Sequence, residues 1–281
     1  MLSYRHGYHA GNHADVFKHA VLCLLLKKLT AKTTPCIYLD THAGAGSYNL
    51  NQQWAQRNAE FLQGIERLLE LEQPPALTAD LLHLVRKARR QSPMAYPGSP
   101  TIARELLRPQ DKLVLMELHN NEISELKRNC RGDKRISFHH RDGFEGLVGV
   151  MPPAIARGLV LIDPSYEVKA DYESTATSVI KAAARWSTGI FAVWYPLLGR
   201  DRNRSQPLLQ HLKSGAQNLL VSELWVKAPS EDFGMHGSGM AIINPPWQLD
   251  LQLQELLPQL SAVLAQDDQA GWRVDWLKAK A

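Results

Sequence analysis

The chain has 281 residues, of which 44% are hydrophobic and 21% are charged. This balance is that of an ordinary globular protein, and it excludes a disordered or collagen-like chain. The 32 Lys and Arg residues exceed the 28 Asp and Glu residues by a net charge of +4, which is too small to indicate nucleic-acid binding by itself.

The sequence also indicates a soluble, cytoplasmic protein. The longest uninterrupted apolar run, 20–26, is far shorter than the roughly 20 residues of a membrane span. The polar N-terminus does not resemble a signal peptide. The three cysteines form no CxxC pair, and their odd number indicates a reducing compartment.

The N-terminal segment carries four histidines within its first 19 residues. Their spacing matches no compact zinc pattern, so we expect no metal. Residues 12–15 predict the start of a helix that packs on a sheet through Val16, Phe17, Ala20, Val21 and Leu24. Two interpretations stay open: a segment that folds over a ligand, or a terminal helix with incidental histidines.

The first predicted strand, 36–40, ends in Asp40 and leads into a glycine-rich turn at 42–46. Glycine allows a ligand to approach the backbone closely, and a following helix N-terminus favours anionic groups. Asn49 replaces the third glycine of the dinucleotide fingerprint, which weakens an NAD or FAD interpretation. The turn instead resembles that of class I S-adenosylmethionine (SAM) methyltransferases, although a tight turn without a ligand is the alternative.

The interval between Asp40 and Glu117 is too long for one α/β crossover. Apolar residues within it follow helical spacing in two groups, separated by prolines. We therefore predict a sheet domain formed by 1–46 and 105–281, with 47–104 inserted as a helical subdomain.

Acidic residues close the next two predicted strands, 112–119 and 135–142. Glu117 is placed to accept hydrogen bonds from both ribose hydroxyls of an adenosine cofactor. Asp142, followed by Gly143, is placed to meet the adenine amino group. A solvated Glu and a simple Asp-Gly turn are the corresponding alternatives.

The fourth predicted strand, 158–164, leads into Asp163-Pro164-Ser165-Tyr166. This resembles the [DN]-P-P-[YFW] signature of methyltransferases that act on nucleobase amino groups. The Asp163 carboxylate and the Pro164 carbonyl can accept hydrogen bonds from the two N–H groups of such an amino group, with Asp163 taking the proton. Tyr166 is predicted to stack on the base.

A second match, Asn244-Pro-Pro-Trp247, fits the signature letter for letter. We choose Asp163 because it follows the fourth strand, near the predicted cofactor. Asn244 closes the last predicted strand, on the far side of the sheet, where prolines also terminate a strand.

Seven apolar runs predict a doubly wound, Rossmann-like α/β sheet that is mainly parallel, with helices at 168–187 and 202–216. The last two runs are joined too closely for a crossover helix and can form an antiparallel hairpin. Basic residues cluster at 86–90, 127–141 and 200–204, either as phosphate contacts or as solvated faces.

Five motifs in order along the chain resemble the bacterial ribosomal RNA large subunit methyltransferase J (RlmJ) family. They are SYRHGYHAGNHADVFKH, YLDTHAGAG, YPGSP, LIDP-x-Y and INPPW. The resemblance covers essentially the whole chain, including the insertion. It implies SAM-dependent methylation of an adenine N6 in 23S rRNA, on naked or early-assembly RNA, by a monomer with no membrane partner.

Carried over by motif, the resemblance also implies site residues. The cofactor would contact His19, His42, Gly44, Ser99, Glu117, Asp142, Gly143 and Asp163. The catalytic group would be Asp163 with Pro164, Tyr166 and Lys18, and the substrate would contact Tyr4, His6 and Tyr166. The sequence departs from the family at Ser165, where proline is typical, and this departure bears on the rate more than on the class of reaction. A DNA adenine-N6 methyltransferase and a binding protein with a degenerate site remain alternatives.

Overall fold

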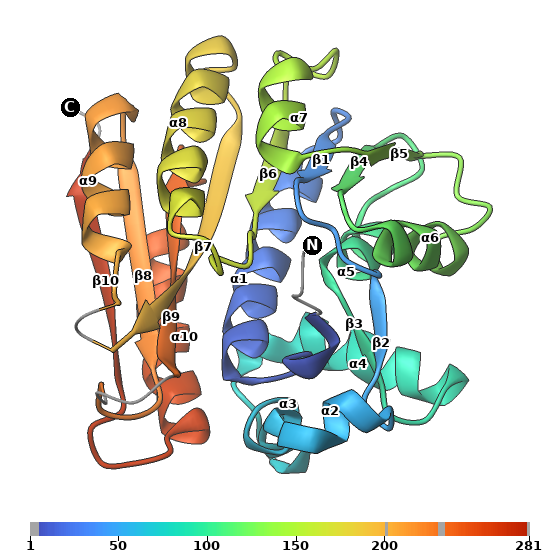
Figure 1. The fold of residues 1–281 in the computed structure, drawn as a ribbon, viewed down its shortest axis with the longest axis vertical. Coiled ribbons are helices and arrows are strands. Elements are labelled where there is room, and N and C mark those ends of the chain that lie inside the picture. The colour runs from blue at the N-terminus through green and yellow to red at the C-terminus, as the bar shows by residue number, and fades with distance from the viewer. Residues whose placement is uncertain (1–5, 200–201, 230–233, 280–281) are drawn as a thin grey trace.

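A central eight-stranded sheet organises the protein in the computed structural model, which describes residues 6–199, 202–229 and 234–279. The strand order is β10-β8-β9-β7-β6-β1-β4-β5 (Figure 1). The strands are β1 (Ile37–Asp40), β4 (Lys112–Glu117), β5 (Ile136–His140), β6 (Gly158–Ile162), β7 (Ile190–Leu198), β8 (Leu219–Trp225), β9 (Met235–Ile243) and β10 (Gly271–Lys278). Strands β5, β4, β1, β6 and β7 are parallel, which confirms the predicted α/β class.

The predicted strand number, seven, was too low because β10 is not among the predicted runs. This strand pairs antiparallel with β8 at the edge of the sheet. Its residues alternate between aromatic or apolar side chains (Trp272, Val274, Trp276) and charged ones (Arg273, Asp275). A period of two is typical of a β-strand, so a signal for β10 was present, although Trp272 and Trp276 are exposed. β8 and β9 form the predicted antiparallel pair, and β9 lies between β7 and β8.

Helices cover both faces of the sheet (Figure 1). One core contains side chains of α1 (His13–Thr30), α5 (Ser99–Leu106), α6 (Asn120–Asn129) and α10 (Leu249–Leu264), and the other contains those of α7 (Gly143–Gly149), α8 (Ala170–Arg185) and α9 (Ser205–Gly215). Successive strand residues alternate between these cores, as Tyr38 and Leu39 do on β1. The predicted helices at 168–187 and 202–216 correspond to α8 and α9.

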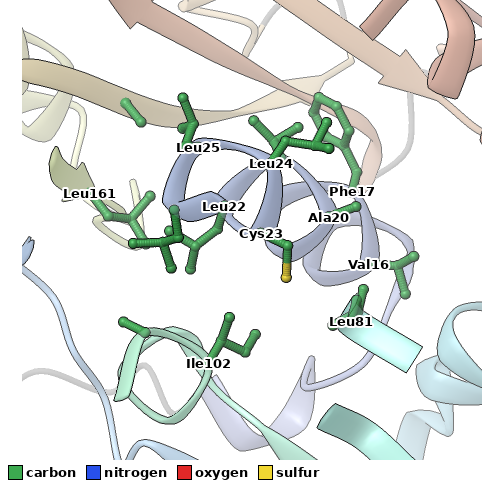
Figure 2. Packing of buried hydrophobic residues seen from close by; sticks show 14 of the residues in the cluster. Val16, Phe17, Ala20, Leu22, Cys23, Leu24, Leu25, Leu81, Ile102 and Leu161 are labelled. Atoms are coloured by element: carbon green, nitrogen blue, oxygen red, sulfur yellow. The ribbon is translucent and has the colours of Figure 1, made fainter. Parts of the chain in front are cut away.

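Helix α1 runs through the centre of the first core. It begins at the predicted position, where the Asn12 side chain accepts hydrogen bonds from the backbone N–H groups of Ala14 and Asp15. Its apolar side chains leave the helix in several directions, including Cys23 toward Ile102 of α5 (Figure 2). Because nearly the whole circumference of α1 is buried, its polar residues near the N-terminus are also buried, and these enter the site described below.

The insertion is not wholly helical, contrary to the prediction. It contains the two-stranded antiparallel sheet β2–β3, whose strands are too short to show a clear period in the sequence. Its elements are β2 (Ser47–Asn49), α2 (Gln53–Asn58), η2 (Glu60–Gln63), α3 (Ile65–Glu70), η3 (Ala76–Thr78), α4 (Ala79–Gln91) and β3 (Ala95–Pro97), and η1 (His6–Tyr8) packs against α2. Helix α5 runs across the predicted boundary at 104, because Ile102 and Ala103 are buried against α1. We retain 47–104 as a proposed subdomain.

No helix within the described residues has the length and apolar character needed to cross a bilayer. The three cysteines are buried and unpaired. Burial raises the pKa of the Cys36 thiol to about 12, so this thiol stays protonated and unreactive at neutral pH.

Candidate active site

The residues predicted to bind the cofactor line one cavity of about 170 Å³ at the carboxyl ends of β1, β4 and β6. All of them border it: His19, His42, Gly44, Ser99, Glu117, Asp142, Gly143 and Asp163. In a doubly wound sheet, the connections on either side of the first strand leave toward opposite faces, and this leaves a crevice for a ligand. The order of the acidic strand ends therefore located this cavity from the sequence.

The turn after β1 is fixed by Glu117. One carboxylate oxygen, Oε2, accepts a hydrogen bond from the backbone N–H of Gly44 at 2.8 Å, and Oε1 accepts one from that of His119 at 2.7 Å. Gly44 has a φ of 58°, and a Cβ there would lie 2.2 Å from the Tyr48 hydroxyl. These bonds hold the Glu117 carboxylate on the cavity wall, and its remaining lone pairs can accept two ribose hydroxyls.

Asp142 and Gly143 form the start of α7 on another wall of the cavity. Asp142 Oδ1 accepts a hydrogen bond from the backbone N–H of Glu145 at 2.9 Å, so it caps the helix as well as lining the cavity. A Cβ at Gly143 would lie 2.2 Å from the Thr41 carbonyl oxygen. The turn-forming role of this Asp-Gly pair is therefore compatible with contact to a ligand.

Asp40 supports the site from beneath, a role that the sequence analysis did not assign. Its side chain is fully buried, and Oδ2 accepts hydrogen bonds from the hydroxyls of Tyr38 and Ser99, both at 2.7 Å. Burial raises the pKa of Asp40 to about 6, although these hydrogen bonds lower it. Asp40 therefore orients Ser99, which borders the cavity.

The free energy of unfolding is expected to fall as the pH rises through the titration of Asp40. The unfolded carboxyl has a pKa near 3.8 and the folded one about 6, so the folded state binds more protons between these values. The amide of Asp40→Asn keeps the shape without titrating, because both hydroxyls can rotate to accept from it. Urea unfolding of both forms between about pH 4 and pH 7 measures the difference, and parallel pH profiles would contradict the assignment.

Two of the histidines on the cavity, His19 and His42, are neutral at pH 7. Burial lowers the pKa of His19 to about 3 and that of His42 to about 4. His19 Nδ1 lies 2.8 Å from the Tyr96 hydroxyl, which fixes the orientation of its ring. Neutral imidazoles do not repel a cation, so these two residues are compatible with a sulfonium ligand.

Asp163 ends a chain of buried ionic contacts. Lys18 Nζ donates to Asp163 Oδ2 at 2.5 Å and lies 2.9 Å from Asp15 Oδ1. Asp15 Oδ2 in turn contacts His6 Nε2 at 2.9 Å. Burial alone would lower the pKa of Lys18, but the two carboxylates outweigh burial and raise it. Burial raises the pKa of Asp163, with Lys18 opposing that shift, which suits a carboxylate that takes up a proton.

A second cavity, of about 220 Å³, lies on the other side of this ionic chain. It shares four lining residues with the first cavity: His6, Lys18, Asp163 and Ser165. Trp194 of β7 also lines it, with its ring centroid 5.5 Å from Lys18 Nζ, and no sequence motif pointed to this residue. Asp163 is thus accessible from two cavities, one of which carries the predicted cofactor residues.

The remaining predicted residues divide between the two cavities. Pro164 lines the first and Tyr166 the second. Tyr166 is only 6% exposed, its ring packs 4.4 Å from that of Tyr172, and its hydroxyl donates to the Trp194 carbonyl at 2.8 Å. It is therefore held rigidly in the wall, and its stacking on a base remains a prediction. Tyr4 lies outside the described residues.

Asn244 and Asp163 lie at opposite ends of the strands of the sheet. It follows β9, which runs antiparallel to β7, so it is adjacent to the start of β7 rather than to its carboxyl end. Its Nδ2 donates to the carbonyls of Ser187 and Gly189 at 2.9 and 2.8 Å. Asn244 therefore links the end of β9 to the segment before β7, and the choice of Asp163 as the catalytic residue stays a prediction.

Some of the basic residues in two of the three predicted clusters form ion pairs within the protein. In 86–90, Arg89 forms a bidentate pair with Glu66, and Lys87 pairs with Glu105. In 127–141, Arg135 pairs with Asp133. The third cluster, 200–204, follows the carboxyl end of β7 next to the second cavity, and its Arg200 lies outside the described residues.

The strand order, with antiparallel β9 between β7 and β8, and the acidic strand ends around a glycine-rich turn define a class I SAM-dependent methyltransferase. SAM is the cofactor of this class. The cavity fits it, because Glu117 is positioned for a ribose, and His19 and His42 are neutral and do not repel a sulfonium.

Comparison with known proteins identifies the family. The family model "Ribosomal RNA large subunit methyltransferase D, RlmJ" matches residues 33–278. Ribosomal RNA large subunit methyltransferase J of Escherichia coli strain K12 is 42% identical, and that of Haemophilus influenzae strain Rd is 39% identical, each over 99% of both chains. A crystal structure from Legionella pneumophila superposes with a TM-score of 0.88 at 32% identity, covering 95% of this chain and 98% of that one. The chain therefore belongs to the RlmJ family.

Proposed function

We propose that this protein is a monomeric enzyme that transfers the methyl group of SAM to the N6 amino group of an adenine in naked or early-assembly 23S rRNA. The observation that carries the proposal is the position of Asp163 between two cavities. The cavity at the carboxyl ends of β1 and β4 suits the cofactor. The cavity beside Trp194 is then left for the target base.

The chemistry of an adenine amino group explains why these residues are needed. Its nitrogen lone pair is conjugated into the ring, so it is a weak nucleophile. When Asp163 and the Pro164 carbonyl accept hydrogen bonds from its two N–H groups, the nitrogen can pyramidalise and its lone pair becomes available. SAM supplies an electrophilic methyl group on a sulfonium, whose sulfur keeps the bonding electron pair. Asp163 accepts the proton that the amino nitrogen loses.

The target base must leave its stack to enter the second cavity. This costs a few kcal/mol in a duplex and less in a loop, so a single-stranded or loosely paired adenine is favoured. Tyr166 and His6 border this cavity and are the proposed substrate contacts, together with Tyr4.

Tritium transfer from labelled SAM to 23S rRNA, taken from a strain that lacks the gene, tests the proposal. Nucleoside analysis of the product should place the label in N6-methyladenosine. Duplex DNA tested in parallel should take up little label. Preferential labelling of DNA would replace the proposal with a DNA methyltransferase, and SAM binding by calorimetry without any transfer would indicate a degenerate site.

The loop after β7 is expected to contact the RNA backbone. Arg202 and Arg204 are exposed, and they follow Leu198 of β7, which lines the second cavity. The double substitution Arg202→Glu and Arg204→Glu should weaken RNA binding and reduce the slope of log K against log salt by about 0.7 for each phosphate that the loop no longer neutralises. Filter binding at several salt concentrations measures the slope.

A matched control reverses the charge of two lysines at the amino ends of the parallel strands, opposite the loop after β7. Lys32 precedes β1 and Lys112 begins β4, and both are exposed. Their double substitution to Glu should leave the slope near that of the wild type. If the two double variants changed the slope equally, the loop after β7 would have no particular role.

A further inference from the structure

The carboxylate assigned to catalysis is already engaged in the structure. Lys18 Nζ donates to Asp163 Oδ2 at 2.5 Å, and the Lys18 and Asp163 side chains are only 4% and 12% exposed. A cation this close withdraws electron density from the carboxylate. It therefore weakens Asp163 both as an acceptor for an amino group and as an acceptor for a proton.

Lys18 has a second carboxylate partner that has no role in the proposed chemistry. Asp15, one helical turn earlier on α1, lies 2.9 Å from Lys18 Nζ and is 2% exposed. Its other oxygen accepts a hydrogen bond from the backbone N–H of Gly11 at 3.0 Å and contacts His6 Nε2 at 2.9 Å. Asp15 is thus fixed in place from three sides.

The fixed position of Asp15 decides where the Lys18 charge can reside. In the described part of the chain, Asp15 and Asp163 are the carboxylates within ion-pairing distance of Lys18. A buried ammonium without a partner is strongly unfavourable. If Asp163 were its single carboxylate partner, Lys18 would have to remain paired with Asp163. With Asp15 present, Lys18 remains paired when the amino group of the base takes Asp163.

We propose that Asp15 is a positioning residue that shares Lys18 with Asp163 and thereby keeps the Asp163 carboxylate available to the amino group of the target base. The proposal rests on the proposed function for its substrate. Its electrostatic part, the sharing of Lys18, is independent of the substrate.

Several groups face Asp163 and contribute to its titration. They are Lys18 and Asp15 of α1, His6 of η1, Tyr38 and Asp40 of β1, and Tyr166 of its own loop. Asp15 raises the pKa of Asp163, whereas Lys18 and His6 lower it. Removing the Asp15 charge should therefore lower the pKa of Asp163, because Lys18 then pairs with Asp163 alone.

The test compares the wild type with Asp15→Asn, Lys18→Met and the double variant. Carboxyl ¹³C NMR of aspartate-labelled protein follows the titration of Asp163, and single-turnover methyl transfer to 23S rRNA gives the rate against pH. Asp15→Asn should lower the pKa of Asp163, slow transfer by about tenfold, and move the acid limb of the rate profile to lower pH. In the Lys18→Met background, Asp15→Asn should have little further effect on the rate. Asp15→Glu, which keeps the charge, should restore most of it.

An unchanged Asp163 titration in Asp15→Asn would overturn the inference, and so would an equal slowing in the Lys18→Met background. A merely structural role would lower the rate without moving the acid limb. If Asp15→Asn does not fold, equal rates for Lys18→Met and the double variant support the inference, and unequal rates contradict it. If the wild type transfers no methyl group to rRNA, the proposed function fails, and the NMR titration alone decides whether Asp15 shares Lys18.

Discussion

Replacing Asp163 by alanine should reduce single-turnover methyl transfer by a factor of about 10² to 10⁴, the usual contribution of a general acid or base. The variant loses the carboxylate that accepts from the amino group and takes its proton. It should still bind SAM, because Glu117 and Asp142 lie on the far wall of the cofactor cavity and keep their own hydrogen bonds. Tritium transfer and calorimetry with the same protein separate these two effects.

Asn244→Ala is the matched control, since Asn244 heads the other copy of the signature. Its side chain bonds only to the Ser187 and Gly189 carbonyls among the partners that the structure describes. The substitution should cost about 1 kcal/mol of stability for each hydrogen bond removed and leave methyl transfer at the wild-type rate. If Asn244→Ala lost activity and Asp163→Ala kept it, the assignment of the catalytic carboxylate would be reversed.

Lys18→Met should lower the free energy of unfolding by about 3–5 kcal/mol at neutral pH, the usual cost of breaking a buried ion pair. Methionine fills a similar volume, but it leaves the Asp15 and Asp163 carboxylates buried without their cation. The lowered pKa of Asp15 should then rise, and the pKa of Asp163, which burial already raises, should rise further. The loss of unfolding free energy in the variant is therefore largest above the raised pKa values and becomes smaller as the pH falls through them. Urea unfolding at several pH values measures both effects.

Lys27→Met provides the comparison on the same helix. Lys27 pairs with Asp80 at 3.1 Å, but its side chain is 70% exposed. An exposed pair contributes about 0–1 kcal/mol, so this substitution should change stability little. Equal losses for the two variants would mean that Lys18 is not stabilised by its buried carboxylates.

The strand ends show what the linear pattern could predict. Continuous apolar runs ended by Asp40, Glu117 and Asp163 are the direct consequence of strands buried on both faces. Parallel strands bring their carboxyl ends together, so the order of the runs was sufficient to place Glu117, Asp142 and Asp163 on one cavity, whereas His19 and Ser99 were predicted from the family resemblance. The start of α1 at Asn12 was equally local, because a cap depends on side chains a few residues apart.

Other features required long-range contacts. The pairing of β2 with β3 joins segments nearly fifty residues apart, and neither strand is long enough to show a period. The α5 boundary depends on burial against α1, which the local sequence of α5 does not record. Trp194 belongs to the site because β7 places it beside Lys18. Its neighbours in the sequence predict only a buried strand, so they did not indicate this role.

The sequence by itself therefore predicted the fold class and proposed Glu117, Asp142 and Asp163 as site residues, because these depend on apolar runs and on the residues that end them. Only the tertiary structure decided that Asp163 shares Lys18 with Asp15, and that it lies between two cavities. The physical reason is that ion pairing and cavity walls depend on distances between segments as far apart as α1 and β6. Chain folding sets those distances, and residue spacing along the chain does not encode them.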